Sequence, residues 1–251
     1  MYSVTQRIGV VKQPRGGYIN PKEFTKIVLN DGVELNPDEN IQPGLIGMAV
    51  DYLTRFMMGT PIDEAFRISL LGSGIVNERK NAERLISKIK GLDDKSIINA
   101  CKVVGYDVCF RAGIYGYRPV EKIKPDDGTI ENIRIMVNRC VSFWAEYGPV
   151  LVDGFTFEGG YTDLVSSGDG DYLTRDTLWD LKVSKDPPKS KYTLQLLMYY
   201  IMGCHSIHRE FDNIKNIGIF NPRLNMVYLL EVSKINDGII REVSTDVIGY
   251  K

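Results

Sequence analysis

The hydrophobic period of the chain changes at Gly148, and this change limits the folds that the chain can adopt. Upstream, apolar residues recur every three or four positions, which is typical of one face of a helix. Downstream, apolar and polar residues alternate, which is typical of strands with one buried face. The sequence therefore predicts a helical first half followed by a sheet.

The second half is predicted to contain five strands and a strongly apolar helix. The strands are expected over Pro149–Phe157, Gly159–Ser166, Asp176–Val183, Ile214–Phe220 and Met226–Val232. The segment SSGDGD is predicted to be a turn before the third strand. The apolar helix is expected over Thr193–Met202, and a helix is favoured for the tail from Ser233.

The first half is predicted to be mostly helical. Helices are expected over Pro43–Gly59, from Pro61 onward, and over Asn81–Ile89, Asp94–Val108 and Ile130–Tyr147. The first 43 residues are rich in Gly, Pro and Asn, and are predicted to be irregular apart from one short helix near Pro21–Leu29. Residues 115–127 form a Pro-rich, charged linker.

This order of elements predicts an α/β fold of the α+β kind, with a mixed sheet and helices packed against it. A helical N-terminal region over 1–125 is expected to pack on the core and contribute to it, with the core itself over 126–251.

The composition restricts the classes of function. With 251 residues, 43% hydrophobic and 25% charged, the chain is predicted to be globular. Its net charge of −1 gives no overall basic excess, so any contact with DNA must come from a local patch. The N-terminus has no apolar signal region, and no apolar run reaches the ~18 residues of a spanning helix. We therefore expect a cytoplasmic protein without a membrane partner.

The cysteines do not indicate a metal ribbon or a redox motif. Cys101, Cys109, Cys140 and Cys204 include no C-x-x-C pair. We expect buried free thiols in a reducing compartment.

The informative segment is the one around the third predicted strand. Asp180 and Lys182 lie two residues apart, so a strand points both side chains to the same face while Leu181 points to the core. Asp163 is expected in the middle of the preceding strand. If the two strands form a hairpin, Asp163 and Asp180 converge at one end of the sheet, beside the Lys182 ammonium.

Two carboxylates held close together repel each other unless a cation lies between them. Mg²⁺ or Mn²⁺ is expected, because hard cations prefer oxygen ligands, and the Leu181 carbonyl is a candidate further ligand. Such a metal lowers the pKa of a bound water, while Lys182 would orient that water or stabilise the developing negative charge. A D-x-K motif that occurs alone on a strand usually marks only a solvent-exposed face of that strand. The ordered set of an acidic strand residue, a turn, W-D-x-K and a helix favours a functional site.

The segment from about Trp144 to Tyr200 resembles the PD-(D/E)XK nucleases, in particular the branch of RecB-type nuclease domains and CRISPR-associated exonucleases. The matching motifs are G-x-x-D at Gly160–Asp163, D-x-K at Asp180–Lys182, and Q-x-x-x-Y at Gln195–Tyr199. The resemblance implies a restriction-endonuclease-like core. It also implies that Asp163 and Asp180 bind metal, that Lys182 is catalytic, and that Gln195 and Tyr199 line the site or the DNA.

A second match lies upstream. That branch often carries G-x-x-x-H at the start of an early helix, and this chain has Gly47 to Asp51 in a similar setting. Asp51 is therefore a candidate replacement for the His in the metal shell, although it is equally well explained as a polar helix residue. Glu146 and Glu158 are rival candidates.

Motifs elsewhere in the sequence bear on the cofactors, the partners and the DNA contacts to be expected. No cysteine follows Cys204, so the iron–sulfur cluster of some relatives is not expected, and no Walker motif indicates a fused helicase. A candidate phosphate-binding patch is formed by Lys182, Lys185, Lys189 and Lys191, with Arg175 just before the predicted catalytic strand, unless this is simply a charged solvated loop. Nearby aromatic residues are candidates for base stacking, although core packing is favoured for Trp179.

The sequence thus favours a Mg²⁺- or Mn²⁺-dependent deoxyribonuclease, with an exonuclease expected, acting on single- or double-stranded DNA in recombination, repair, phage or defence processes. A separate helicase or recombination protein is a candidate partner. The alternatives are a catalytically inactive module of the same fold that binds nucleic acid or protein, and an unrelated small-molecule enzyme whose D-x-K is coincidental.

Overall fold

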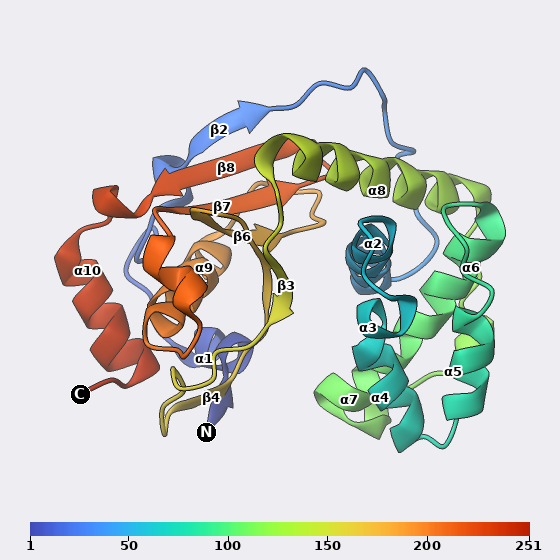
Figure 1. Cartoon of the computed structure of the whole chain (residues 1–251), viewed down its shortest axis with the longest axis horizontal. Coiled ribbons are helices and arrows are strands. Elements are labelled where there is room, and N and C mark those ends of the chain that lie inside the picture. The colour runs from blue at the N-terminus through green and yellow to red at the C-terminus, as the bar shows by residue number, and fades with distance from the viewer. The chain divides into compact units, whose positions relative to one another are not determined.

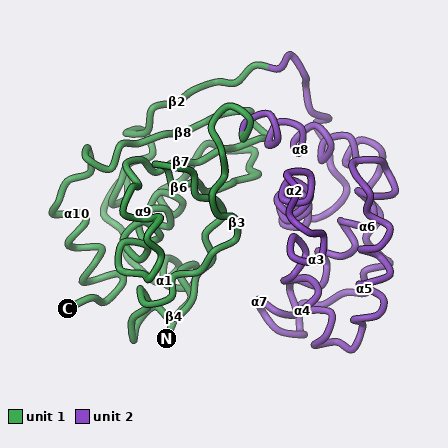
Figure 2. Tube along the Cα trace, in the orientation of Figure 1, with its two compact units in different colours: residues 1–30, 144–251 green, residues 31–143 purple.

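The computed structural model describes all 251 residues, which form two compact units (Figure 2). Unit 1 contains residues 1–30 and 144–251, and unit 2 contains residues 31–143. The two units do not correspond to a single division of the sequence near residue 125, because the first 30 residues lie with the second half of the chain. The chain is mixed α/β.

Unit 1 is built on an open sheet of six strands in the order β2-β8-β7-β6-β5-β3 (Figure 1). Only β6 and β7 run parallel, and every other neighbouring pair is antiparallel. The strands are β2 Thr25–Val28, β3 Val152–Phe155, β5 Gly170–Leu173, β6 Thr177–Leu181, β7 Asn216–Asn221 and β8 Met226–Glu231. The predicted mixed sheet is therefore confirmed.

The expected strand over Gly159–Ser166 is wrong. Only Val165–Ser167 form a strand there, β4, which pairs in parallel with the two-residue β1, Tyr2–Ser3, outside the six-stranded sheet. The hairpin partner of β6 is instead β5, which begins inside the predicted turn. On its other side β5 pairs with β3, and Gly170 permits that pairing because a Cβ there would lie 2.2 Å from the Phe155 ring.

The short helix predicted near Pro21–Leu29 is also wrong. A 3-10 turn covers Pro21–Glu23, and the chain then extends as β2 at the edge of the sheet, paired with β8. Pairing with a strand 200 residues away overrides the weak local helix signal.

The helices of unit 1 complete one face of the sheet. They are α1 Val4–Val10, α9 Ser190–Cys204 and α10 Asp237–Glu242, with one π-helical turn over Val243–Ile248. The helix α9 joins β6 to its parallel neighbour β7. Leu178 of β6 and Ile217 and Ile219 of β7 belong to the same core cluster as Leu194 and Met198 of α9. The predicted apolar helix and the C-terminal helix are confirmed.

Aromatic residues pack on the other face. The Trp179 ring meets Trp144 edge-on at 6.2 Å and Tyr147 at 5.6 Å between ring centroids, and Trp179 is 2% exposed. Gly218 on β7 lies directly under this ring, since a Cβ would approach it to 2.4 Å. The prediction that Trp179 is a core residue is confirmed.

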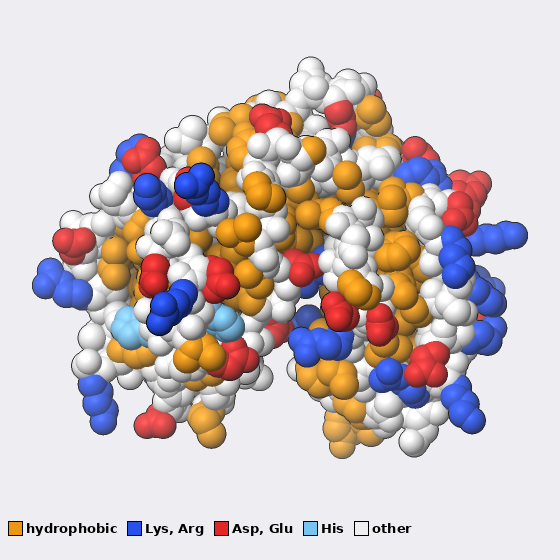
Figure 3. Space-filling model, viewed as in Figure 1, with side chains coloured by type: hydrophobic (Ala, Val, Ile, Leu, Met, Phe, Trp, Pro, Cys, Tyr) orange, Lys and Arg blue, Asp and Glu red, His pale blue; other side chains and the backbone are white.

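Unit 2 is helical. It contains α2 Pro43–Met57, α3 Ile62–Ala65, α4 Arg67–Ile75, α5 Arg79–Ile86, α6 Asp94–Val103, α7 Asp107–Ala112 and most of α8 Asp127–Tyr147. The predicted helical segments are confirmed, except that the one from Asp94 is broken by a 3-10 turn over Val104–Tyr106. Hydrophobic side chains are exposed around α4 and α7, including Leu71, Ile75 and Phe110 (Figure 3).

The four thiols are free, and three of them are buried as expected. Cys204 at the end of α9 is exposed, which corrects the prediction for that residue. No helix has both the length and the apolar character needed to cross a membrane.

Candidate active site

Asp180 lies on β6, a strand whose residues are all buried, and Lys182 directly follows the last residue of the strand. Because side chains alternate along a strand, Asp180 shares the α9 face with Leu178, whereas Trp179 and Leu181 point to the opposite face. The Lys182 Nζ lies 2.7 Å from Asp180 Oδ1. The Asp180 side chain is 1% exposed and the Lys182 side chain 21%, so the ion pair is buried on the carboxylate side. The other Asp180 oxygen, Oδ2, is buried and accepts no hydrogen bond.

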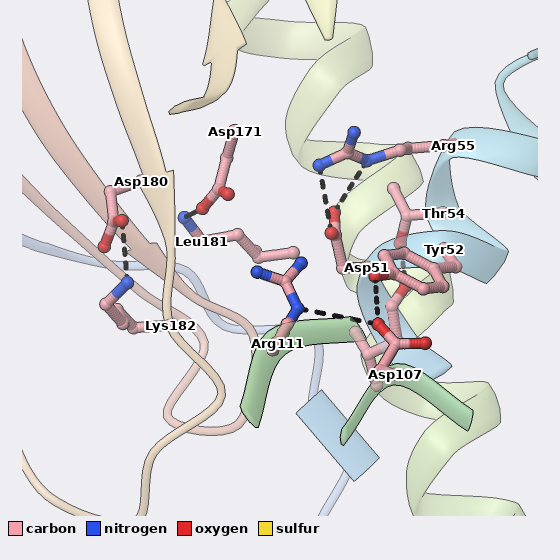
Figure 4. Close-up of polar contacts among 11 residues, drawn as sticks. Asp51, Tyr52, Thr54, Arg55, Asp107, Arg111, Asp171, Asp180, Leu181 and Lys182 are labelled. Carbon is pink, nitrogen blue, oxygen red and sulfur yellow. Dashed lines mark hydrogen bonds and ion pairs between the residues drawn. The ribbon is translucent and has the colours of Figure 1, made fainter. Parts of the chain in front are cut away.

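A second carboxylate faces this pair from β5. The hairpin pairs Tyr172 with Trp179, so the next residues along the two strands, Asp171 and Asp180, stand across from each other. Asp171 Oδ2 accepts a hydrogen bond of 2.8 Å from the Leu181 main-chain N–H (Figure 4). A side-chain carboxylate thus accepts the N–H of Leu181 just beyond the main-chain pairing of β5 with β6.

The electrostatics of Lys182 reflect both carboxylates. Burial lowers the pKa of the Lys182 ammonium, but the negative charges of Asp180 and Asp171 more than offset this, so its pKa lies above the usual lysine value. The Tyr192 ring also lies 5.5 Å from Nζ, which stabilises the cation further. Lys182 is therefore a protonated donor at neutral pH.

Gln195 and Tyr199 share one face of α9, as the i, i+4 spacing predicts. Gln195 Nε2 donates to the Tyr199 Oη at 2.7 Å. Burial raises the pKa of Tyr199 well above its usual value, and the nearby charges of Asp180 and Asp171 raise it further. The phenol is therefore a neutral hydrogen-bonding group in the field of both carboxylates.

Asp163 does not lie on the sheet. It is an exposed residue in a bend before β4, so the expected hairpin between its segment and β6 is not formed. The carboxylate that the hairpin brings to Asp180 belongs to Asp171, which the sequence reasoning missed. A signal was present, because Gly168–Asp171 also spells G-x-x-D and leads directly into the buried pair Tyr172 and Leu173.

Asp51 lies on α2 in unit 2, where Arg55 holds it. Arg55 Nε and Nη2 donate to the two carboxylate oxygens of Asp51 at 3.1 and 3.0 Å (Figure 4). This bidentate pair at i, i+4 compensates the charge of Asp51 within its own helix. The spacing of Arg55 was the sequence signal for this pairing.

The rival carboxylates also have defined places. Glu146 is exposed near the end of α8. Glu158 accepts hydrogen bonds from the Thr156 hydroxyl and, at 3.0 Å, from His208 Nε2. These bonds lower the pKa of Glu158 to about 2. The ring of His205 stacks on Tyr250 with 4.0 Å between ring centroids. Neither histidine belongs to a group of three or more His, Cys, Asp or Glu side chains that could hold a metal ion.

The lysine-rich segment follows β6 and runs into α9. Lys189 forms an exposed ion pair with Asp186 at 2.8 Å, and the Lys191 ammonium lies 4.9 Å from the centre of the Tyr192 ring. Lys185 and Lys191 are exposed. The segment therefore presents positive charge close in sequence to Lys182.

The arrangement on β5 and β6 combines two carboxylates, a protonated amine and a neutral phenol. No group of three or more His, Cys, Asp or Glu side chains gathers anywhere in the chain in a way that could hold a metal ion. A cation at this site would thus have two carboxylates, with main-chain oxygen and water as the remaining ligands. Mg²⁺ is bound in proteins by one or two carboxylates with several retained waters.

Comparison with known proteins gives no relative: no family model, no curated protein and no solved structure matches the chain.

Proposed function

We propose that this chain is a metal-dependent nuclease that hydrolyses phosphodiester bonds in DNA, with Asp171, Asp180 and Lys182 at its active centre. Asp171 takes the place that the sequence reasoning gave to Asp163, because Asp171 is the carboxylate on the strand paired with β6. The proposal is carried by one observation. Two carboxylates on adjacent strands and an ammonium group meet at one end of a hairpin, on the face of the sheet covered by α9.

The donor set fits a hard divalent cation. The carboxylates of Asp171 and Asp180 would hold Mg²⁺ or Mn²⁺, and the Leu181 carbonyl is a candidate third oxygen ligand. When bound, such an ion lowers the pKa of a water and stabilises negative charge on a phosphate oxygen. Asp51 belongs to the other unit and is paired with Arg55, so its place in a metal shell remains a separate prediction, as do those of Glu146 and Glu158.

The side chains of the site have complementary tasks. Lys182 is held protonated by Asp180 and Asp171, and is placed to donate to an attacking water or to a phosphate oxygen that gains negative charge. The paired Gln195 and Tyr199 offer neutral hydrogen bonds beside the carboxylates without adding negative charge that would repel DNA. The lysines after β6 provide exposed positive charge for the phosphate backbone.

The fold supports the same proposal. A hairpin carrying D-x-K on its second strand, followed by the crossover helix α9 and a parallel strand, is the arrangement expected for the restriction-endonuclease-like core implied by the family resemblance. On this basis we also propose an exonuclease of the RecB-type and CRISPR-associated branch, acting in recombination, repair, phage or defence processes.

The test is cleavage of end-labelled linear single-stranded and double-stranded DNA and of a closed circle, with Mg²⁺, Mn²⁺ or EDTA. We expect cleavage only with metal, and a loss of at least about a hundredfold in Asp180→Ala. Sparing of the circle would identify an exonuclease. DNA binding without cleavage under every condition would instead support the inactive binding module.

A matched pair of variants distinguishes the two candidate carboxylates. Asp171→Asn should abolish cleavage and also the rise in thermal stability that Mn²⁺ gives the wild type, whereas Asp163→Asn should preserve both. The metal-dependent stability is independent of turnover. Equal effects of the two variants would refute the assignment of Asp171.

A further inference from the structure

Unit 2 contains a cavity of about 380 Å³ that the proposed nuclease site does not use. Its walls are the first turn of α2, the chain around Val104–Val108, and the segment from Gly116 to Ile123. A volume of this size is in the range of small-molecule sites in proteins. All three walls belong to unit 2, so the cavity is complete within that unit.

The interior of the cavity is apolar. Leu45 and Met48 project from α2, and Val108 and Ile123 line the other walls. All four side chains are only partly buried, so apolar surface remains uncovered by the protein. An apolar ligand body would remove that surface from water, which is favourable.

The charged residues that line the cavity are all positive. Arg118 and Lys122 are its only charged lining residues, and neither side chain forms a hydrogen bond or ion pair with the protein. The neighbouring carboxylate of Glu121 is engaged elsewhere, 2.8 Å from the Lys102 ammonium and 3.7 Å from Arg84. The positive charge at the cavity is therefore not neutralised by its surroundings.

The first turn of α2 adds a weaker attraction for anions. The N-cap residue Gln42 makes no side-chain capping bond, and Pro43 has no N–H. Gly44 follows, and a Cβ at this position would meet no atom within 4 Å, so open space lies beside the start of the helix. The positive end of the helix dipole thus faces solvent at the cavity wall.

Hydrogen bonds of the Asn40 side chain hold two of the cavity walls together. Asn40 Nδ2 donates to the Lys124 carbonyl at 2.9 Å, and Asn40 Oδ1 accepts from the Asp126 N–H at 3.0 Å and from the Thr129 hydroxyl at 3.1 Å. These bonds join the segment before α2 to the segment that follows Lys122. The two walls that carry the polar groups are consequently fixed relative to each other.

We propose that this cavity binds a small amphipathic anion, with an apolar body against Leu45, Met48 and Val108 and a terminal phosphate or carboxylate beside Arg118 and Lys122. The ligand class follows from two features of the cavity. Its interior offers apolar surface that the protein leaves uncovered, and its two charged residues are cations without a carboxylate partner. A nucleoside monophosphate and an alkyl phosphate share this chemistry, and the test separates them.

The test uses the full chain and isothermal titration calorimetry with octyl phosphate, thymidine monophosphate, inorganic phosphate and octanol. We expect at least one of the two amphipathic anions to bind about tenfold more tightly than inorganic phosphate and than octanol. Tighter binding of thymidine monophosphate would identify a nucleotide site, and tighter binding of octyl phosphate an aliphatic site. Absence of binding by both would overturn the proposal.

Two variants and a control locate the binding. Arg118→Ala combined with Lys122→Ala should weaken binding at least tenfold, because two charge-assisted contacts are lost. Gly44→Leu should also weaken it at least tenfold, because Gly44 lines the cavity and a larger side chain would occupy ligand space without a Cβ clash. Lys124→Ala changes an exposed lysine outside the cavity lining and should have no effect. Unchanged affinity in both test variants, with folding confirmed by circular dichroism, would refute the site.

Discussion

Replacement of Lys182 by Met tests how strongly the candidate site depends on its buried ion pair. The substitution keeps an unbranched side chain of similar length but removes the ammonium 2.7 Å from Asp180 Oδ1. Removal of one partner from a buried ion pair costs about 3–5 kcal/mol. Because the Lys182 side chain is 21% exposed, water reaches part of the pair, and we expect a loss of about 2–4 kcal/mol.

A second ion pair in the same region provides the control. Lys189 Nζ lies 2.8 Å from Asp186 Oδ2, but the two side chains are 58% and 62% exposed. Exposed pairs contribute little to stability because water screens their charges, so Lys189→Met should leave the free energy of unfolding nearly unchanged. The distance is nearly the same in both pairs, and burial is the variable that differs.

The assay is equilibrium unfolding in urea with EDTA present, followed by tryptophan fluorescence. The two tryptophans of the chain, Trp144 and Trp179, both lie in unit 1, so the signal reports the unit that contains the site. The double variant Asp180→Asn with Lys182→Met completes the cycle and should recover about 2 kcal/mol relative to the sum of the single changes. Additive effects, or equal losses in Lys182→Met and Lys189→Met, would refute the argument from burial.

Two further predictions concern packing and pH. Gly72→Ala should destabilise unit 2 by about 3 kcal/mol, because its Cβ would lie 2.1 Å from the Tyr106 main-chain oxygen. Gly74→Ala in the same helix meets nothing within 4 Å and should stabilise unit 2 by up to about 1 kcal/mol. Urea unfolding followed by circular dichroism measures both effects, and equal effects would contradict the packing argument. The lowered pKa of Glu158, about 2, means that its stabilising bonds to Thr156 and His208 are fully present above pH 4.5 and are lost as the pH falls from 4.5 towards 2. Since the Glu158–His208 pair is exposed, we expect the stability lost on acidification to be only about 1 kcal/mol. Glu158→Gln should remove that part of the acid dependence of stability. An unchanged acid transition in the variant would show that Glu158 does not contribute.

Local sequence patterns were sufficient for the helices and for the face on which the central side chains lie. The 3.6-residue period placed α2 and α8, and the two-residue period placed Asp180 and Lys182 on one face of a strand with Leu181 on the other. The i, i+4 spacing of Gln195 and Tyr199 likewise predicted that they share one face of a helix, where the structure joins them by a hydrogen bond. Each of these features depends on residues within one or two turns of chain, so the sequence alone determines them.

Strand pairing was decided only by the tertiary structure. The sequence offered both Asp163 and Asp171 as carboxylates at the end of a G-x-x-D, and the choice between them depends on which segment pairs with β6. The same holds for Thr25–Val28, whose partner β8 lies about 200 residues away. The free energy of such pairing comes from cross-strand contacts and shared burial rather than from local propensity, so no short window of sequence contains the information.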